Sequence, residues 1–121
     1  MDGMDAVMPR PRVVSASVSG TSLADPYVSI ILPCYNEQDH VTAEVARICA
    51  AMDSSGYTYE LLAFDDASTD ETLARLHEAA SQFPSLQIVA FHRNGGSGTV
   101  RRIGTQQARG EIVVWTDADM S

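Results

Sequence analysis

Short apolar runs alternate along this chain with segments in which apolar residues recur every three or four positions. The first run, Tyr27 to Leu32, is rich in β-branched residues and is followed by Pro33, which predicts a strand that ends there. Three later runs of the same character predict strands over residues 59–64, 86–91 and 111–116. Helical spacing lies between the runs, so strand and helix alternate three times and the series ends on a strand.

Three helices are predicted between these strands. The first should extend from about Asp39 to Asp53, because one face of it would carry Val41, Val45, Ile48 and Met52. The second is predicted to begin at a capping box, in which Ser68 caps the helix and Glu71 reaches back to the cap N–H. The third opens at the glycine-rich loop of residues 94–98 and is expected to stop at Gly110.

This alternation predicts the fold class. Short strands that are apolar throughout, linked by helices, indicate a parallel sheet covered on both faces. Because such crossovers are right-handed, we expect an α/β, Rossmann-like, doubly wound unit with a mostly parallel sheet. Residues 1–25 have no apolar period and are predicted to form a flexible tail, which leaves residues 26–121 as one domain.

Composition narrows the possible functions. The 121 residues carry a formal net charge of −8, which argues against a general nucleic-acid binder and suits a site that collects a metal cation. No lysine occurs, which excludes a Schiff-base or phosphate-loop lysine within these residues. Two cysteines, Cys34 and Cys49, make no disulfide framework and indicate a reducing compartment.

Acidic residues follow the ends of the predicted strands. Because ligands bind beyond the carboxyl ends of parallel strands, one rim of the sheet should carry Glu37, Asp65, Asp66, Asp117 and Asp119. Two like charges ~4 Å apart repel by about 4 kcal/mol at an effective dielectric constant near 20, so this rim favours a cation or a hydrogen-bonding ligand. Asp117 and Asp119 are the best candidates to bind Mg²⁺ or Mn²⁺, and the alternative for such a pair is a solvated turn.

Two further motifs leave their interpretation open. Asp65 and Asp66 could accept hydrogen bonds from a base or a ribose, or could cap the next helix; binding is favoured for Asp66 and the two interpretations are balanced for Asp65. The N–H groups of the loop at residues 95–98 could bind phosphate, or its glycines could serve a tight turn. The loop does not match the dinucleotide-binding fingerprint, because Arg101 stands where the third glycine would fall.

Taken together, three segments resemble the inverting family 2 glycosyltransferases, which have the GT-A fold. The segments are Pro33-Cys34-Tyr35-Asn36-Glu37, Asp65-Asp66-Ala67-Ser68-Thr69-Asp70 and Asp117-Ala118-Asp119, in that order from Tyr27 to the end of the chain. Ala67 departs from the glycine usual in the family. Within the family, the dolichyl-phosphate mannose synthase branch is similar in Gly96-Ser97-Gly98-Thr99, Gly104 and Asp117-Ala118-Asp119-Met120-Ser121.

The resemblance implies a donor and an acceptor. The donor would be a sugar linked to UDP or GDP, and the acceptor a polyprenyl phosphate. Asp117 and Asp119 would hold Mg²⁺ or Mn²⁺ against the diphosphate. Pro33, Tyr35, Glu37 and Asp66 would hold the nucleoside, so that the predicted donor site comprises Pro33, Tyr35, Glu37, Asp65, Asp66, Gly98 and Asp117.

In this family the acceptor-binding half, any general base and any membrane-contacting helices lie beyond the metal motif, at which this chain stops. We therefore expect an N-terminal portion that transfers no sugar alone and is marginally folded, because its last strand has an unpaired edge. The longer protein is expected in the cytoplasm, peripheral to a membrane. Two alternatives are a non-catalytic nucleotide-binding or regulatory module and a nicotinamide dehydrogenase, which the absent glycine fingerprint after the first strand disfavours.

Overall fold

A computed structural model describes residues 25–116 of the chain as a four-stranded sheet with three helices. The elements are β1 (Val28–Cys34), α2 (Val41–Ser55), β2 (Tyr59–Asp65), α3 (Thr72–Ala80), β3 (Leu86–Ala90), α4 (Gly96–Gln107) and β4 (Ile112–Trp115). All seven elements predicted from the apolar pattern are present, in the predicted order.

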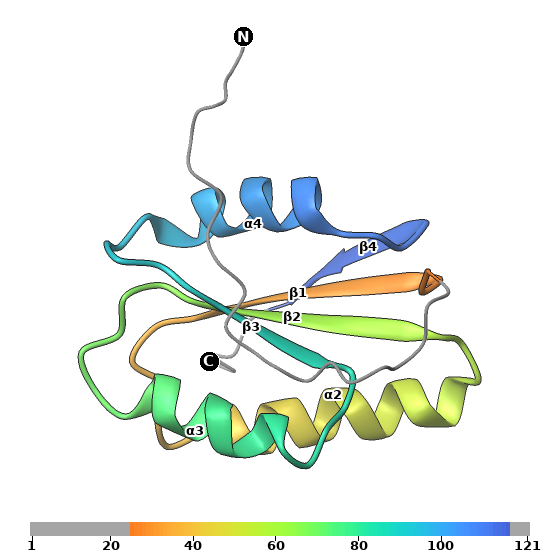
Figure 1. The fold of residues 1–121 in the computed structure, drawn as a ribbon, viewed down its shortest axis with the longest axis horizontal. Coiled ribbons are helices and arrows are strands. Elements are labelled where there is room, and N and C mark those ends of the chain that lie inside the picture. Colours follow the sequence, from red (N-terminus) through yellow and green to blue (C-terminus); the bar gives the residue numbers. More distant parts are fainter. Residues whose placement is uncertain (1–24, 117–121) are drawn as a thin grey trace, which may run out of the picture.

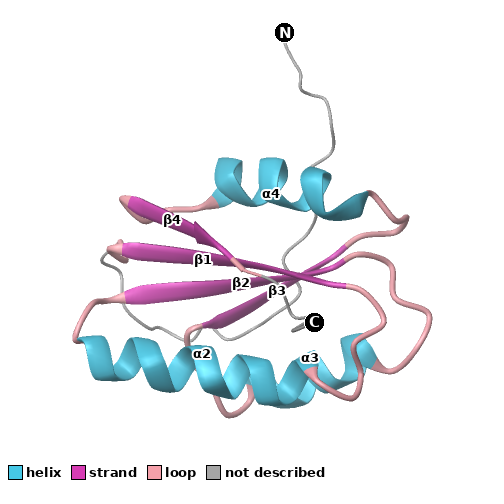
Figure 2. Ribbon diagram, turned by 180° about the vertical axis from the view of Figure 1, so that it is seen from behind, coloured by secondary structure: helices cyan, strands magenta, loops and turns pink. Residues whose placement is uncertain are grey.

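The sheet is parallel, with strand order β3-β2-β1-β4. Helices α2 and α3 cover one face and α4 covers the other, as Figure 1 and, from behind, Figure 2 show. The chain first builds outward from β1 to β3, and then returns through α4 to place β4 on the opposite side of β1. This arrangement confirms the predicted α/β, doubly wound, Rossmann-like fold and puts the switch point between β1 and β4.

The prediction that Pro33 ends the first strand is wrong, because β1 continues through Pro33 to Cys34. The carbonyl of Ile31 accepts the N–H of Thr116 on the β4 side, and Pro33, two residues later, points to the same side. Within residues 25–116, the pairing of β1 with β4 ends at the Ile31–Trp115 pair. Proline is therefore tolerated, because the N–H that it lacks would face beyond that pairing.

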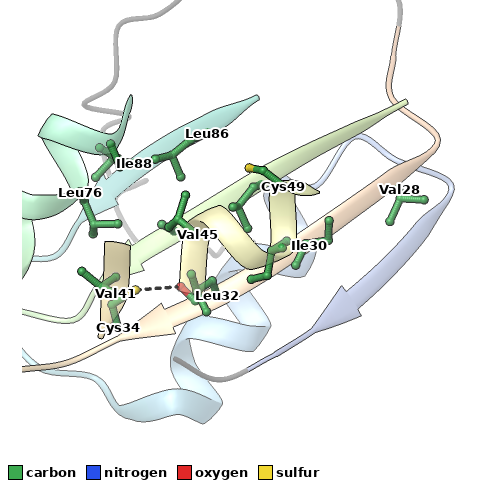
Figure 3. Close-up of a cluster of buried hydrophobic side chains, with 14 residues drawn as sticks. Val28, Ile30, Leu32, Cys34, Val41, Val45, Cys49, Leu76, Leu86 and Ile88 are labelled. Atoms are coloured by element: carbon green, nitrogen blue, oxygen red, sulfur yellow. Dashed lines mark hydrogen bonds between the residues drawn. The ribbon is translucent and has the colours of Figure 1, made fainter. Parts of the chain in front are cut away.

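The hydrophobic core has two parts, one on each face of the sheet. Between the sheet and helices α2 and α3, the larger cluster packs β1 residues such as Ile30 and Leu32 against Val41 and Val45 (Figure 3). On the α4 face, Phe64 packs with residues that include Ile31, Leu62, Val89, Val100 and Ile103. Buried side chains on both faces confirm that the sheet is covered twice, as the continuous apolar strands predicted.

Glycine 104 lets α4 approach the sheet closely. A Cβ atom added at Gly104 would lie 2.7 Å from Cγ2 of Ile31 and 3.1 Å from Cε1 of Phe64. No real side chain tolerates such contacts without movement of the neighbours, so α4 requires a residue without a side chain at this point.

A buried carboxylate joins three segments at the amino end of the sheet. Glu60 in β2 accepts the hydroxyl of Ser29 at 2.6 Å, the backbone N–H of Arg109 at 2.8 Å and Nε of Arg109 at 3.2 Å. The Ser29 hydroxyl in turn accepts the N–H of Gly110 at 2.8 Å. We call these four residues the Glu60 cluster; they fix the segment between α4 and β4 against β1 and β2.

Gly110 does not stop α4, contrary to the sequence prediction. The helix ends at Gln107 and its C-cap, Ala108, is extended. A Cβ atom at Gly110 would lie 2.8 Å from the backbone N of Ser29, so the glycine is needed for close approach to β1. A sequence pattern cannot separate these two uses of glycine, because the contact is with a residue 81 positions earlier.

The side chains of β4 are the most exposed of the sheet. Ile112, Val114 and Trp115 are all exposed, although Trp115 donates its indole N–H to the Thr105 hydroxyl and lies near the Arg101 guanidinium. Among residues 25–116, no helix is long and apolar enough to cross a membrane.

Candidate functional site

The carboxyl ends of β1, β2 and β3 bring most of the predicted site residues to one edge of the sheet. Pro33 lies near the end of β1, and Tyr35 and Glu37 follow that strand; Asp65 is the last residue of β2, and Asp66 follows it. The glycine-rich loop comes between β3 and α4. Asp117 and Asp119, the predicted metal ligands, lie outside the residues that the structure describes.

The loops after β1 and β2 are joined by hydrogen bonds in both directions. The N–H of Asn36 donates to the Ser68 hydroxyl at 2.9 Å, and the Asn36 side chain accepts the N–H of Thr69 at 2.8 Å. Further along, the side chain of Gln38 accepts the N–H of Glu71 at 2.9 Å. We call residues 36–38 and 68–72 the paired loops. Their bonds hold the two strand ends in one fixed relation.

These bonds overturn the predicted capping box. Ser68 does not cap α3, since its hydroxyl accepts a bond from Asn36, and the helix begins four residues later, at Thr72. The first helical N–H, that of Thr72, donates to the Asp70 carboxylate at 2.9 Å. A carboxylate is a stronger acceptor than a hydroxyl. The local Ser-x-x-Glu pattern failed because its members bind a loop about 32 residues away.

Two residues of this edge hold a backbone conformation that favours glycine. Asn36 has φ +50° and Ala67 has φ +63°. Asparagine tolerates this left-handed region, whereas alanine is strained there by roughly 1 kcal/mol or more. The alanine that stands in place of the glycine usual in the resembled family thus lies at a turn that glycine fits best.

Asp66 binds the start of α4 instead of capping the helix that follows it. Its two carboxylate oxygens accept the N–H groups of Gly95 and Gly96 at 2.7 and 2.8 Å. Its carbonyl accepts the side chain of Asn94 at 3.1 Å. Because the carboxylate already engages these N–H groups, phosphate binding by the loop would have to use others. Gly98 is exposed, and a Cβ atom there would meet nothing within 4 Å.

Asp65 is a buried carboxylate with an unused acceptor. The residue is 3% exposed, and its Oδ1 atom has no hydrogen-bond partner. Burial raises the pKa of this carboxyl above its usual range, although hydrogen bonds from Ser68 act in the opposite direction. A buried polar atom without a partner is uncommon, so Asp65 has the capacity to accept one more donor.

The remaining candidate residues at this edge differ in their exposure to solvent. Tyr35 is 46% exposed, Pro33 and Glu37 are half-buried, and Cys34 is fully buried. Burial, followed by the nearby charges of Asp65 and Glu37, raises the pKa of the Cys34 thiol far above its ordinary value. Cys34 is therefore an unreactive packing residue.

A metal site cannot be built from the described part of the edge alone. Residues 25–116 contain no group of three or more His, Cys, Asp or Glu side chains placed to hold a metal ion. The predicted metal ligands, Asp117 and Asp119, lie outside these residues.

Sequence reasoning missed two groups of residues. It gave no role to Asp70 and Thr72, which organise the paired loops, and it did not single out Glu60. The signal for Glu60 was visible as one acidic residue inside an otherwise apolar strand. Asp70 and Thr72 bind each other locally, but their bonds to Gln38 and Glu37 gave no sequence signal, because those two residues lie more than 30 positions earlier.

The sequence model of glycosyl transferase family 2 matches residues 29–121. An undecaprenyl-phosphate 4-deoxy-4-formamido-L-arabinose transferase of Edwardsiella ictaluri is 38% identical over 96 residues, which make up 78% of this chain and 29% of that protein. A dodecaprenyl-phosphate galacturonate synthase of Rhizobium johnstonii is 34% identical over 94 residues, or 77% of this chain and 28% of that protein. The chain thus spans less than a third of these relatives.

Solved structures give a consistent result. A mannosyltransferase of Pyrobaculum calidifontis in complex with GDP-Man and Mn²⁺ has a TM-score of 0.68 and 30% identity, covering 80% of this chain and 28% of that one. TarS of S. aureus in complex with UDP-GlcNAc has a TM-score of 0.65 and 28% identity, covering 77% of this chain and 26% of that one.

Proposed function

This chain belongs to glycosyl transferase family 2, and we propose that it forms the donor-binding part of an enzyme that transfers a sugar from a nucleotide-sugar to a polyprenyl phosphate. Support for the donor comes from the solved relatives, which hold GDP-Man or UDP-GlcNAc. Support for the acceptor comes from the names of the related transferases, which act on undecaprenyl or dodecaprenyl phosphate.

The observation that carries this proposal is the unpartnered oxygen of Asp65 at the carboxyl edge. A base or ribose offers N–H and O–H donors, which are what a buried carboxylate oxygen lacks. At the same edge of the sheet, the exposed ring of Tyr35 offers an aromatic face, and Pro33 and Glu37 lie at the end of β1 and in the loop after it. Asp66 keeps further lone pairs for the nucleoside while it holds the glycine loop.

The diphosphate of the donor requires a positive charge at this acidic edge. We assign Asp117 and Asp119 as ligands of Mg²⁺ or Mn²⁺, because carboxylate oxygens are the ligands that these hard cations prefer. Mn²⁺ in the mannosyltransferase relative is consistent with such a requirement. When bound, the ion would neutralise charge on the departing nucleoside diphosphate. The protein side chains would hold and orient the donor against it.

Acceptor binding and proton removal are assigned to chain beyond the matched region of the longer relatives. The alignment covers 29% of the arabinose transferase, so most of such an enzyme has no counterpart in these 121 residues. We therefore propose that residues 1–121 bind a nucleotide but do not transfer sugar alone. A polyprenyl phosphate acceptor would place the complete enzyme at a membrane surface, on its cytoplasmic side.

Calorimetric titration of the chain with GDP and with UDP, each with Mn²⁺ and with excess EDTA, tests the donor proposal. We expect one of the two nucleotides to bind in a metal-dependent way. Asp119→Asn should remove the metal dependence, whereas Glu78→Gln, an exposed α3 carboxylate far in sequence from the motif, should leave it unchanged. Failure of both nucleotides to bind with Mn²⁺ would contradict the proposal.

A further inference from the structure

Asp70 is a motif residue that the donor proposal leaves without a role. Its Oδ1 atom accepts the Thr72 N–H at 2.9 Å and the Thr72 hydroxyl at 2.5 Å. Its Oδ2 atom accepts the Gln38 N–H at 3.3 Å. Both oxygens of one half-buried carboxylate are therefore engaged, one on its own loop and one on the loop after β1.

Thr72 extends this contact to Glu37. The Thr72 side chain is fully buried, and its hydroxyl donates to Asp70 while accepting the Glu37 N–H at 2.8 Å. Because the hydroxyl has a single proton, its donation to Asp70 turns its lone pairs toward Glu37. The Glu37 carbonyl accepts the N–H groups of His40 and Val41, both at 2.9 Å, so the backbone of Glu37 is held on both sides.

We propose that Asp70 is a positioning residue for the donor site, which fixes the backbone of Glu37 through Thr72 and that of Gln38 directly. This inference rests on the proposed function, because Glu37 is one of the residues assigned to the nucleoside. Asp70 itself binds no donor in this scheme. It sets donor affinity by holding the loop after β1 in the conformation that presents Tyr35 and Glu37.

The chemistry of the contact requires a carboxylate. Three donors converge on two oxygens, and an asparagine would present an NH₂ group to at least one of them. Although burial acts to raise it, hydrogen bonds from Thr72 and Gln38 lower the pKa of Asp70 below its usual range. The side chain is therefore charged at neutral pH, as this acceptor role demands.

A residue that only caps a helix would need fewer hydrogen bonds than Asp70 and Thr72 make. Capping of α3 requires only the bond from the Thr72 N–H. The bonds to Gln38 and, through the hydroxyl, to Glu37 join two loops that are more than 30 residues apart. A cap would affect stability alone, whereas a positioning residue would also affect the affinity of each folded molecule for the donor.

The test compares four variants of the chain with the wild type by titration with GDP and UDP in the presence of Mn²⁺. Asp70→Asn and Thr72→Val remove the acceptor and the hydroxyl, and Thr72→Ser restores the hydroxyl on a smaller side chain. The matched control is Asp53→Asn, which changes an aspartate at the end of α2 that accepts the Tyr59 hydroxyl at 3.0 Å. Circular dichroism melts give the folded fraction of each variant.

We expect Asp70→Asn and Thr72→Val to raise the dissociation constant roughly tenfold after correction for the folded fraction. Thr72→Ser should stay within about threefold of the wild type, because it keeps both bonds of the hydroxyl. Asp53→Asn should bind like the wild type. In hydrogen exchange, the Glu37 amide should lose protection in Asp70→Asn and Thr72→Val only.

The outcomes separate the two proposals. If the wild type binds a nucleotide and the Asp70→Asn and Thr72→Val variants bind it equally well, Asp70 is a structural cap and the inference is wrong, while the donor proposal stands. Equal weakening by Thr72→Ser and Thr72→Val would also overturn it, because the hydroxyl would then not matter. If the wild type binds neither nucleotide with Mn²⁺, both proposals are wrong.

Discussion

The two ends of β2 each carry one buried carboxylate, and the two carboxylates differ in how completely they are hydrogen-bonded. Glu60 near the amino end and Asp65 at the carboxyl end are both 3% exposed. Both oxygens of Glu60 have partners, in Ser29 and Arg109. One oxygen of Asp65 has none. Equal burial therefore accompanies complete hydrogen bonding at one end and incomplete bonding at the other.

This difference separates a structural carboxylate from one available for binding. A buried charge is tolerated when its hydrogen bonds are complete, and an incomplete set lowers stability. The Glu60 cluster fixes the approach to β4 and offers nothing further to a ligand. Asp65 retains an acceptor at the edge where parallel sheets bind ligands, which is the reason that we assign it to the donor.

The largest expected effect on stability comes from removing the carboxylate whose hydrogen bonds are complete, that of Glu60. Glu60→Ala should lower the free energy of unfolding by about 3 kcal/mol, because it leaves the Ser29 hydroxyl and the Arg109 N–H groups without their acceptor. Urea unfolding followed by circular dichroism measures the change. A loss below about 1 kcal/mol would show that the cluster does not carry the stability of this end.

Alanine substitutions at two glycines, one near each end of the sheet, should change the free energy of unfolding in opposite directions. Gly110→Ala should lower the free energy of unfolding by about 2 kcal/mol, because its Cβ would meet the backbone of Ser29 and Val28, which cannot move aside. Gly98→Ala, at an open position in α4, should instead raise it by about 0.5–1 kcal/mol. Thermal melts of the two variants provide the comparison, and similar losses in both would contradict it.

Asp65→Asn should alter the pH dependence of the free energy of unfolding. Burial raises the pKa of Asp65, so between its unfolded and folded values the folded chain holds more protons. The contribution of Asp65 therefore makes the free energy of unfolding fall as pH rises through that range. The variant lacks this contribution, so its stability relative to the wild type should increase from acid to neutral pH. A difference that is constant with pH would show that Asp65 is not perturbed.

The smallest expected effect concerns the backbone of the carboxyl edge. Ala67→Gly should raise the free energy of unfolding by roughly 0.5 kcal/mol, because relief of strain at φ +63° exceeds the extra entropy of glycine in the unfolded chain. Ala74→Gly, on the exposed face of α3, should lower it by about 1 kcal/mol. Chemical denaturation of both variants, together with the wild type, decides whether position 67 is strained.

Local patterns in the sequence predicted the helices and strands, because the period of the apolar residues and the glycine and proline residues between segments are local signals of secondary structure. The bounds of α2 differ from the prediction by two residues at each end, Val41–Ser55 against Asp39–Asp53. The sequence also indicated which loops lie at the carboxyl edge, since strand direction in a parallel sheet is uniform. The sequence could not predict hydrogen bonds between distant loops, such as those that join Ser68 to Asn36 and Asp66 to Gly95. In these pairs, nothing in the sequence around one residue indicates which distant residue it binds.

The proline near the end of β1 has a further consequence for the switch point. Continued pairing of β4 along β1 beyond Ile31 would next require an N–H from Pro33, which the imino ring does not have. At this position, the side of β1 that faces β4 therefore carries no hydrogen-bond donor, whatever the conformation of the loops around it. No rearrangement of side chains or loops can supply that N–H, so the missing donor beside the switch point is a permanent property of the polypeptide.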